Sequence, residues 1–473
     1  MIWYKKLMRR ISLALLARSS PDALLRLGEK RVLLAFRRAS ANVSAYRATL
    51  ASYGVNPEDI RSIAEFQSHC PTLNKTNTFA RYPLNELCIA TGLDNLAGVL
   101  TSSGHGARFG YGLTTRIQAK YACDAIDLGL EYAFQVDSKK TLLINCLPMG
   151  VRFSSNSVTV AETSVREDMA VALATEFGRF FEQIIVVGDP LFLKLVTDYA
   201  REQKVDWKNY KVNLVIGEET FGEHFRNYLA DHFHLDNDDP STGVIASSMG
   251  VAELGLNLFY ETIQTIKLRR LAHTNPEFFK TLFGISPAAA PLPMLFVYNP
   301  LRSYVETVGN DEAGYGSLTI SMSDPDAPLP LLRYQTGDIA RIFSSDEIAR
   351  ACKLCGLPSP GKLTLPIIAL KGREKDQLPD GTHAGQYKDA LYAQPDIALK
   401  LSGAFRLEYA GGQMLIHVQL RRGCEADDNL SARLAAEFPG TVAPEQVRVW
   451  AYLQFPYGMT LDYERKFNYY APV

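Results

Sequence analysis

The stretch "TSSGHGARFG", Thr101–Gly110, combines hydroxyl groups, glycines and an arginine directly after the apolar "LAGVL". Glycines let backbone N–H groups turn toward a phosphate, hydroxyls can donate to its oxygens, and the Arg108 guanidinium can neutralise its charge. The Gly-Lys-Ser/Thr ending of a P-loop is absent. The stretch therefore fits either a phosphate-binding loop or a plain flexible connection.

Two further stretches place carboxylates near the ends of strand-like runs. "VIGEET", Val215–Thr220, ends its apolar run in Gly-Glu-Glu, and "IASSMGVAELG", Ile245–Gly255, places Glu253 after a glycine-containing turn. A carboxylate on such a loop could hold Mg²⁺ beside a phosphate, because Mg²⁺ prefers oxygen ligands. A solvated glutamate near a helix start is the alternative interpretation for each stretch taken alone.

A single aspartate stands out in "PLLRYQTGDIARI", Pro330–Ile342. Gly337 predicts a turn between two strand-like runs, and this turn presents the Asp338 carboxylate at a fixed point. The two carboxylate oxygens are acceptors that suit two adjacent hydroxyls, as on a ribose. A polar turn residue without a ligand is the alternative.

Two cysteines in "CKLCG", Cys352 and Cys355, have zinc-knuckle spacing. A tetrahedral zinc site needs four ligands. Cys424 and His417 are the only candidates for the other two ligands, so the pattern favours cysteines that bind no metal. A zinc site stays open as the alternative. The polar run "DHFHLDNDD", Asp231–Asp239, favours a solvated loop over a metal site.

The overall composition bounds the class of protein. A chain of 473 residues predicts two or three domains, and 47% apolar with 21% charged residues is a globular composition. The formal net charge of -1 argues against a general polyanion binder, so we expect no nucleic-acid partner. Seven scattered cysteines do not form a disulfide framework, which indicates a reducing, cytoplasmic location.

The N-terminal "MIWYKKLMRRISLALLARSS" has basic residues between apolar positions that recur at helical spacing. No apolar run reaches the ~20 residues that span a bilayer. We expect a helix docked on its own protein or on a partner subunit, and peripheral membrane contact stays open.

Helices and strands must position these residues. A helical pattern runs from Asp22 to Leu50, and Pro57–Asp59 suit the first turn of another helix. In the middle of the chain, buried strand-like runs alternate with amphipathic stretches, which predicts βαβ units and a largely parallel sheet. Ligands usually bind at the carboxyl ends of such strands.

After Pro291 shorter strands and frequent turns follow, and near Gly372 the pattern changes again to mixed strands and helices. The charged, glycine-flanked "KGREKDQLPDG" indicates a domain boundary close to Lys371–Asp376.

Taken together, these stretches resemble the adenylate-forming ligase superfamily, and within it the phenylacetate–CoA ligase-like branch. "PLLRYQTGDIARI" is nearly the family's Pro-Leu-Leu-Arg-Tyr-x-Thr-Gly-Asp signature, and "TSSGHGARFG" is similar to its Ser-Ser-Gly-Thr-Thr-Gly-Lys phosphate loop. "SSMGVAELG" is similar to its Tyr-Gly-x-Thr/Ser-Glu motif, and "GREKD" to the Gly-Arg-x-x-Asp stretch before its hinge. "SAYRATLASYGVNPEDIRSIAEFQSHCPTLNK", which ends at Lys75, resembles the branch's opening pattern, so the likeness covers nearly the whole chain.

The resemblance implies a fold and a domain division. We expect a large multi-sheet α/β adenylation domain over residues 1–371, with a helical N-terminal segment over about residues 1–75. A small α+β C-terminal domain, residues 372–473, would move on a hinge at Lys375 and Asp376.

The resemblance also implies roles for individual residues. The ATP phosphates would be bound by Thr101, Ser102, Ser103, Gly104, His105, Gly106 and Arg108. Adenine and ribose would be bound by Gly217, Glu218, Glu219, Asp338 and Arg373. The catalytic residues would be Glu253, which holds Mg²⁺, and Lys466 in "YERKFNYY", which would stabilise charge at the reacting centre.

Four departures from the family pattern bear on activity. His105 stands where the phosphate loop usually has Thr, and the loop is one residue shorter. Ala252 replaces the usual Thr or Ser before Glu253. The segment after Asp376, "QLPDGTHAGQYKDALY", does not align with the family's thioester-forming loop, so transfer to CoA is less well supported than adenylation.

The function implied by the resemblance is an AMP-forming ligase. It would use ATP and Mg²⁺ to adenylate a small carboxylic acid, with an aromatic acid as the first guess, and pass the acyl group to CoA. A carrier-protein thiol or an amine as acceptor, with an acyl-carrier protein as partner, stays an alternative. So does a catalytically degenerate nucleotide-binding homologue. A homodimer is expected from the resemblance alone.

Overall fold

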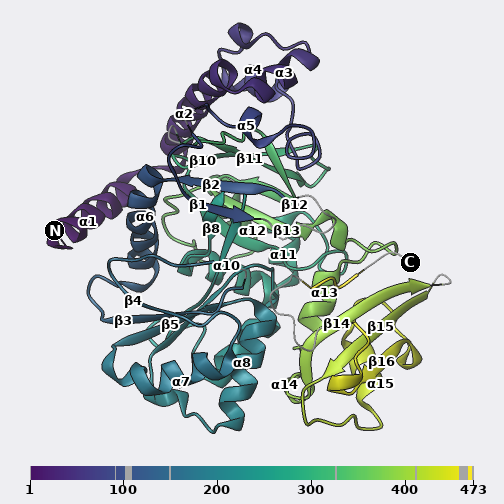
Figure 1. Cartoon of the computed structure of the whole chain (residues 1–473). Helices are drawn as coiled ribbons and strands as arrows, with labels where there is room; N and C mark the ends of the chain where they lie inside the picture. The colour runs from purple at the N-terminus through teal and green to yellow at the C-terminus, as the bar shows by residue number, and fades with distance from the viewer. Residues whose placement is uncertain are drawn as a thin grey trace. The chain divides into compact units, whose positions relative to one another are not determined.

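The structure, a computed structural model, describes residues 2–90, 92–101, 109–148, 151–324, 327–410, 413–457 and 467–470 (Figure 1). The chain divides into two compact units. Unit 1 comprises Met1–Phe134, Met249–Gln264 and Leu295–Leu370, and unit 2 comprises Gln135–Ser248, Thr265–Met294 and Lys371–Val473. Four of the described elements cross these limits. β9 (Met294–Tyr298) and β13 (Ile367–Arg373) have most of their residues in unit 1, and β7 (Ile245–Val251) and α10 (Ile263–Thr274) have most of theirs in unit 2.

Unit 1 combines N-terminal helices with mostly antiparallel strands. Its helices are α1 (Ile2–Arg18), α2 (Pro21–Asn42), α3 (Ser44–Ser52), α4 (Ile63–His69), α5 (Leu84–Leu87), α6 (Arg116–Phe134) and α12 (Ser345–Leu354). Its strands are β1 (Leu96–Thr101), β2 (Tyr111–Thr115), β8 (Gly255–Tyr260), β9 (Met294–Tyr298), β10 (Ser303–Val308), β11 (Gly316–Met322), β12 (Tyr334–Phe343) and β13 (Ile367–Arg373). β1 and β2 form an antiparallel pair, and the other strands lie in the order β10-β11-β12-β13-β9-β8.

Two sequence-based helix predictions for the N-terminal region are wrong in detail. The helical pattern from Asp22 to Leu50 is two helices, because Val43 adopts an extended conformation (φ -110°, ψ 110°) between α2 and α3. Pro57–Asp59 form a single 3₁₀ turn that Asn56 caps, and the next α-helix begins only at Ile63. A proline followed by acidic residues is favourable at the start of a 3₁₀ turn as well as of an α-helix. These residues alone therefore do not predict how long the helical segment is.

Unit 2 contains the parallel βαβ units that the sequence predicts. Its strands β3 (Thr141–Asn145), β4 (Thr159–Glu162), β5 (Gln183–Gly188), β6 (Val212–Ile216) and β7 (Ile245–Val251) lie in the order β7-β6-β5-β3-β4. Its helices are α7 (Glu167–Phe177), α8 (Pro190–Glu202), α9 (Glu223–Phe233), α10 (Ile263–Thr274) and α11 (Pro276–Phe283). All four registered pairs among these strands are parallel. β3 and β5 are buried along their whole length, and α7 and α8 pack side by side along them (Figure 1).

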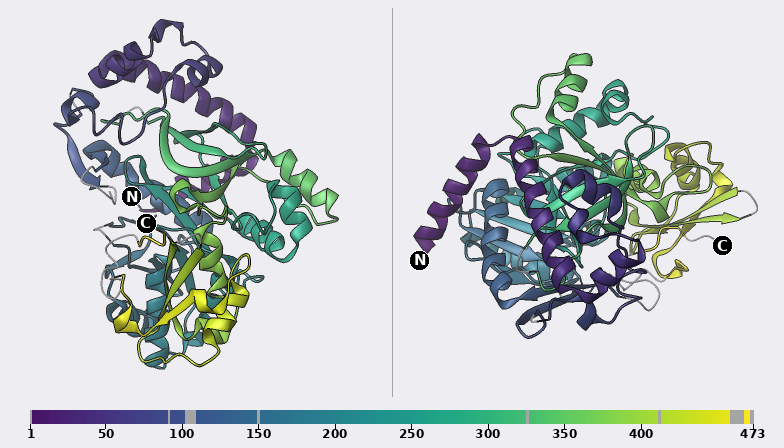
Figure 2. Two further views of the ribbon diagram at one scale, coloured as in Figure 1. Left: turned by 90° about the vertical axis from the view of Figure 1, so that its right-hand side faces the viewer. Right: turned by 90° about the horizontal axis from the view of Figure 1, so that it is seen from above.

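The C-terminal part of unit 2 has its own small sheet. It contains α13 (Ala384–Ala390), α14 (Pro395–Ala398), β14 (Leu401–Ala410), β15 (Gln413–Leu420), α15 (Leu430–Glu437) and β16 (Val447–Trp450). β14 pairs antiparallel with β15, β15 pairs parallel with β16, and α15 packs on β16 (yellow-green in Figure 2). The predicted α/β class, with several sheets and an α+β C-terminal part, is therefore confirmed. The division at residue 371 into a large and a mobile domain stays a prediction.

No helix within the described ranges combines the length and the apolar character that crossing a membrane requires.

Candidate functional site

Glu253, in the turn between β7 and β8, is the centre of a charged cluster in unit 1. Its side chain is almost fully buried, with 2% exposed. Its Oε1 atom lies 3.2 Å from the Lys75 ammonium and accepts a hydrogen bond of 3.3 Å from the Tyr334 hydroxyl. Burial, and then the neighbouring Glu253, raise the pKa of Tyr334, so this phenol keeps its proton and acts as a donor. A buried acceptor-only group is thus fixed at one point by a cation and a hydroxyl.

The backbone near Lys75 explains how this lysine reaches Glu253. Leu73 bridges to β12 as a short parallel strand: its N–H donates to the Arg333 carbonyl (2.9 Å), and its carbonyl accepts from the Gln335 N–H (2.8 Å). The Asn74 side chain then accepts from the N–H of Thr76, 2.9 Å away, which turns the chain directly after the bridge. Lys75 is therefore held beside Tyr334 by main-chain pairing.

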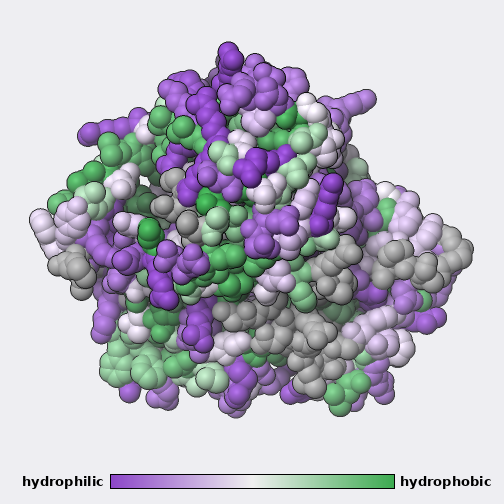
Figure 3. All heavy atoms as spheres, turned by 45° about the horizontal axis from the view of Figure 1, so that its top comes forward, coloured by the Kyte–Doolittle hydropathy of each residue, from purple (hydrophilic) through white to green (hydrophobic). Residues whose placement is uncertain are grey.

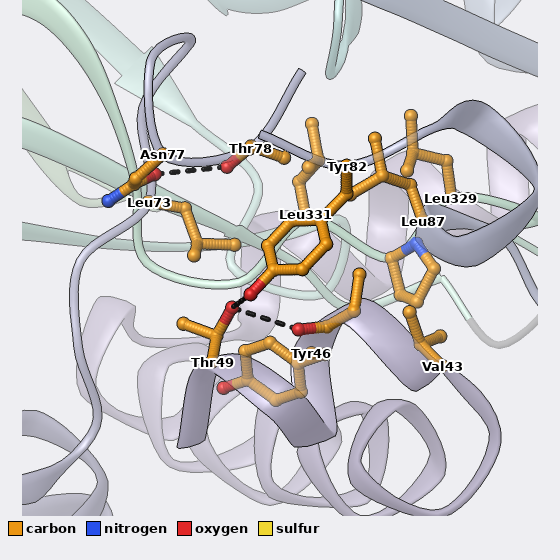
Figure 4. A pocket seen from close by; sticks show the side chains of 12 residues that line it. Val43, Tyr46, Thr49, Leu73, Asn77, Thr78, Tyr82, Leu87, Leu329 and Leu331 are labelled. Carbon is orange, nitrogen blue, oxygen red and sulfur yellow. Dashed lines mark hydrogen bonds between the residues drawn. The ribbon is translucent and has the colours of Figure 1, made fainter. Parts of the chain in front are cut away.

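A small cavity lies next to this segment (Figure 4). It has a volume of ≈ 20 Å³, room for about one water molecule, and Tyr82 and Thr49 share a hydrogen bond of 3.3 Å inside it. It is lined by Val43, Ala45, Tyr46, Thr49, Leu73, Asn77, Thr78, Tyr82, Leu87, Leu329, Pro330 and Leu331. This close packing joins the N-terminal helices to the residues before β12, and it leaves no room for a substrate.

The ends of the predicted phosphate loop lie at the same cluster. Thr101, the last residue of β1, pairs with Tyr111 of β2, so residues 102–110 connect the two strands of a hairpin. A Cβ atom at Gly110 would come within 2.2 Å of the Glu253 Oε1 atom, and one at Gly112 within 1.9 Å of the Ala252 carbonyl oxygen. Only glycine fits at these two positions, and this contact holds the end of the loop against Glu253.

One of the predicted phosphate-binding residues, Thr101, lies within the described residues. Thr101 is exposed at the end of β1. The others lie outside the described residues: Ser102, Ser103, Gly104, His105, Gly106 and Arg108.

A buried ion pair supports the start of β12. Arg333 has a left-handed backbone conformation (φ 50°), and its guanidinium donates to Glu306 through Nε (2.8 Å) and Nη2 (3.3 Å). Its Nη1 donates to the Cys70 carbonyl. Burial raises the pKa of Glu306, and the Arg333 guanidinium partly offsets this rise. Arg333 thus ties the Cys70–Leu73 segment, and with it Lys75, to β12.

Asp338 lies in the interior of β12, which corrects the prediction of a turn between two strands. The register with β11 passes from Ser317↔Ile339 to Thr319↔Gln335, so β12 contains two extra residues at this point. Such a bulge bends a strand and re-aims its side chains. Gly337 supplies the positive φ of 79° that the bulge needs, and Asp338 is 6% exposed. Its N–H donates to the Thr336 hydroxyl (3.3 Å).

The predicted adenine-binding residues follow β6 in unit 2. The Gly217 N–H donates to the Gly188 carbonyl (3.0 Å), which joins the carboxyl ends of β5 and β6, and Glu218 has a φ of 68°. The Glu219 carboxylate accepts from the Lys388 ammonium (2.5 Å) and from the Tyr469 hydroxyl (3.0 Å). Glu219 is thus paired with residues from the C-terminal part of the same unit.

Tyr469 belongs to a short C-terminal segment that runs beside β14. The Leu407 N–H donates to the Tyr469 carbonyl (2.8 Å), and Leu407 bridges in parallel to Tyr470. The Arg406 guanidinium donates to the Asn468 carbonyl. Lys466, the predicted catalytic lysine, lies outside the described residues, but the segment that follows it is anchored to β14 and to Glu219.

The sequence did not predict two residues: Lys75 of unit 1 as a partner of Glu253, and Asp189 of unit 2. Asp189 follows β5 and caps α8, where its Oδ1 atom accepts from the Phe192 N–H (3.0 Å). Its buried Oδ2 atom has no hydrogen-bond partner among the described residues. Burial, and more weakly Glu219 and Glu218, raise the pKa of Asp189 to about 7. The Gly-Asp pair at the end of "QIIVVGD" could have indicated Asp189 as a candidate site residue, because ligands bind at the carboxyl ends of parallel strands.

The predicted hinge and the cysteine pair have ordinary local structure. Arg373 ends β13, and Lys375 and Asp376 lie in the 3₁₀ turn Glu374–Asp376. The Arg373 carbonyl lies 3.3 Å from the His383 Nε2 atom. Burial lowers the pKa of His383, which favours its neutral form as the donor.

Cys352 and Cys355 lie at the end of α12 and both are free thiols. No group of three or more His, Cys, Asp or Glu side chains within the described ranges could hold a metal ion.

The fold of the chain is similar to that of a solved CoA ligase and of a solved acyl acid amido synthetase. A 2-hydroxyisobutyryl-CoA ligase in the postadenylation state with 2-HIB-AMP has a TM-score of 0.66 at 14% identity, over 96% of this chain and 89% of that one. Its open conformation with 2-HIB-AMP and CoA has a TM-score of 0.54 at 14% identity, over 95% and 91%. The acyl acid amido synthetase AtGH3.15 in complex with 2,4-DB has a TM-score of 0.52 at 12% identity, over 94% and 89%.

No protein-family model and no curated protein matches the chain. The solved structures confirm the predicted likeness to adenylate-forming ligases at the level of the fold, which extends over nearly the whole chain.

Proposed function

We propose that this chain is an ATP-dependent, AMP-forming ligase that adenylates a carboxylic acid and passes the acyl group to CoA. The observation that carries the proposal is the Glu253 cluster: a buried carboxylate, a lysine and a phenol lie at the end of a glycine-rich hairpin loop. The same fold, over 96% of the chain, is that of a CoA ligase whose solved structure holds an acyl-AMP.

In the first step a carboxylate oxygen of the acid would attack the α-phosphorus of ATP. The bond from this phosphorus to the oxygen that bridges to the β-phosphate would break, and pyrophosphate would leave with the electron pair. In the second step the thiolate of CoA would attack the acyl carbon, and AMP would leave. The mixed anhydride is reactive, so water must be excluded until the thiol arrives.

The residues divide between the parts of ATP. The Thr101–Arg108 loop would hold the phosphates, and Gly217–Glu219 would lie beside the adenine. Asp338 and Arg373 would hold the ribose. Lys466 would stabilise negative charge at the reacting centre, and the segment from Phe467 to Tyr470 would fix its approach through the Tyr469–Glu219 hydrogen bond.

Glu253 fits a magnesium site of the usual kind. Mg²⁺ is commonly held by one or two carboxylates together with phosphate oxygens and water, and Glu253 supplies one such carboxylate next to the loop. When bound, the ion would neutralise phosphate charge. The Lys75 ammonium, 3.2 Å from Oε1, would add a fixed positive charge at the same place and orient the carboxylate.

An amine is a second candidate acceptor. The likeness to an acyl acid amido synthetase over 94% of the chain favours it, as does the segment after Asp376 that does not align with the thioester-forming loop. A carrier-protein thiol and a catalytically degenerate homologue stay as further alternatives. Cytoplasmic location and a homodimer belong to the proposal as well.

The test is pyrophosphate release from Mg·ATP across a panel of aliphatic, hydroxylated and aromatic acids. Each acid is assayed alone, with CoA, and with a mixture of amino acids. Pyrophosphate release that requires one particular acid supports adenylation. The addition, CoA or amino acids, that gives multiple turnovers identifies the acceptor. Protein that is folded and binds ATP but releases no pyrophosphate with any acid would support the degenerate homologue instead.

A further inference from the structure

The charge of the chain is distributed unevenly, and its basic part is N-terminal. Residues 1–47 contain eleven Lys and Arg but only two Asp and Glu, a net charge of +9, whereas the whole chain has -1. The remainder therefore carries -10. Such an asymmetry at one end of a chain is typical of a segment that meets an anionic partner.

The basic residues on one side of α1 hold this helix on its own unit. Lys5 lies 2.9 Å from Asp124, and Arg9 lies 3.6 Å from the buried Asp127, both on α6. The Lys362 ammonium donates to the Ala17 carbonyl (2.6 Å) at the other end of α1. These ion pairs lie between α1 and α6. They therefore determine which side of α1 is exposed to solvent.

The outward side of α1 and α2 is rich in large apolar side chains. Trp3 is 74% exposed, Leu15 60% and Leu34 62%. Among residues 3–42 the exposed large apolar side chains are Trp3, Tyr4, Leu7, Met8, Ile11, Leu15, Leu27 and Leu34. We call this set the N-terminal apolar surface. In Figure 3 hydrophobic (green) spheres gather on the left side of the molecule, where Figure 1 draws α1.

Exposed bases border this surface. The sequence of α1 contains no acidic residue. The exposed Lys and Arg of the two helices are Arg10, Arg18, Arg26, Lys30, Arg31 and Arg37. Large apolar side chains next to arginines and lysines, with Trp and Tyr at one end, are the composition of helices that lie in a membrane interface.

We propose that the N-terminal apolar surface, with the bases around it, docks on the surface of a membrane that contains anionic lipids. The apolar side chains would enter the boundary between headgroups and acyl chains, and the bases would attract anionic headgroups. A second copy of the chain fits less well. A twofold interface brings the same patch of both copies together, and here that would place arginines against arginines.

The test is co-sedimentation of the full chain with vesicles, with Trp emission as a second readout. Vesicles of phosphatidylcholine alone are compared with vesicles that also contain phosphatidylglycerol. We expect binding to the anionic vesicles, weakened by added salt, and a blue shift of Trp3 emission. Trp3→Ser/Leu15→Ser should lower the partition coefficient at least about tenfold. Arg10→Gln/Arg18→Gln should lower it roughly 25-fold, about fivefold for each base.

A matched control removes two apolar side chains that are equally exposed elsewhere. Leu354 is 70% exposed and Leu453 85%, so Leu354→Ser/Leu453→Ser should bind vesicles like the wild type. None of these four positions on α1 belongs to the proposed ATP site, so pyrophosphate release without vesicles should be unchanged in all variants. Vesicle binding can therefore fail while pyrophosphate release persists, and the reverse, so the two proposals are tested independently.

Three results would overturn the proposal. Absence of binding to anionic vesicles, or equal loss in the control variant, would exclude a membrane-docking surface at these helices. Self-association of the wild type, measured by light scattering and abolished in Trp3→Ser/Leu15→Ser without any vesicle binding, would assign the surface to a second copy of the chain.

Discussion

Replacing Asp189 by asparagine should change how the stability of this protein depends on pH. The Asp189 carboxyl has a pKa of about 7, raised first by burial, whereas the same group in an unfolded chain titrates near 3.8. Between these values the native state binds a proton that the unfolded state lacks. Stability must therefore fall as the pH rises through this range. The Asp189→Asn variant would keep the N-cap of α8, because asparagine caps a helix as well as aspartate does.

The magnitude follows from the linkage relation. Between about pH 5.5 and the native pKa of about 7 the unfolded carboxyl is ionised while the native one still holds its proton, a span of about 1.5 pH units or about 2 kcal/mol at 1.36 kcal/mol per unit. Asp189 is partly accessible to solvent, which screens the charge, so a loss of about 1–2 kcal/mol is expected. Above a pH of about 7 the carboxyl is ionised in both states, so stability falls no further through this group between there and about pH 8.5.

The assay is urea unfolding of the wild type and of Asp189→Asn at both pH values. The free energy of unfolding of the wild type should fall relative to the variant by about 1–2 kcal/mol between about pH 5.5 and about pH 8.5. Asp206→Asn is the matched control, since Asp206 caps the 3₁₀ turn Trp207–Asn209 from an exposed position. Parallel changes with pH in wild type and Asp189→Asn would refute the argument that burial holds this carboxyl neutral.

Three further predictions concern unit 1. Glu253→Gln should lower the rate of pyrophosphate release about 10²–10³-fold at saturating substrates, measured by a coupled assay, because it removes the charge opposite the proposed magnesium ion; an unchanged rate would remove Glu253 from the site. Asp338→Ala should raise the KM for ATP at least tenfold while the thermal midpoint stays unchanged, and wild-type kinetics would contradict a ribose contact. Glu306→Gln should cost about 3–5 kcal/mol in urea unfolding, because it leaves the buried Arg333 guanidinium without its carboxylate; a loss below about 1 kcal/mol would show that this pair does not support β12.

The parallel strands were the most predictable part of the fold. The runs "TLLINCLP", "QIIVVGD" and "VNLVIGEE" are continuous apolar segments, and β3 and β5 are buried along their whole length. Strands buried on both faces lose the alternation of half-exposed strands, so length and flanking glycines identify them. The break at Val43 was not predictable, because nothing in its local pattern separates α2 from α3.

The candidate site was predictable only where a motif is contiguous in sequence. Asp338 and Glu253 each stand in a recognisable stretch, although the bulge at Gly337 depends on pairing with β11. Lys75 reaches Glu253 only because Leu73 pairs with β12. Pairing of this kind joins segments far apart in sequence, and no local pattern reports it.

The most direct measurement of the central claim is the fate of an acid labelled with ¹⁸O in its carboxylate. After turnover with Mg·ATP and the acceptor identified in the panel, the nucleotide and pyrophosphate are separated and analysed by mass spectrometry. Adenylation predicts that one labelled oxygen is recovered in AMP, because the carboxylate oxygen that attacks the α-phosphorus leaves with it. Label in pyrophosphate or phosphate, or turnover without label in AMP, would contradict an acyl-adenylate and with it the proposed function.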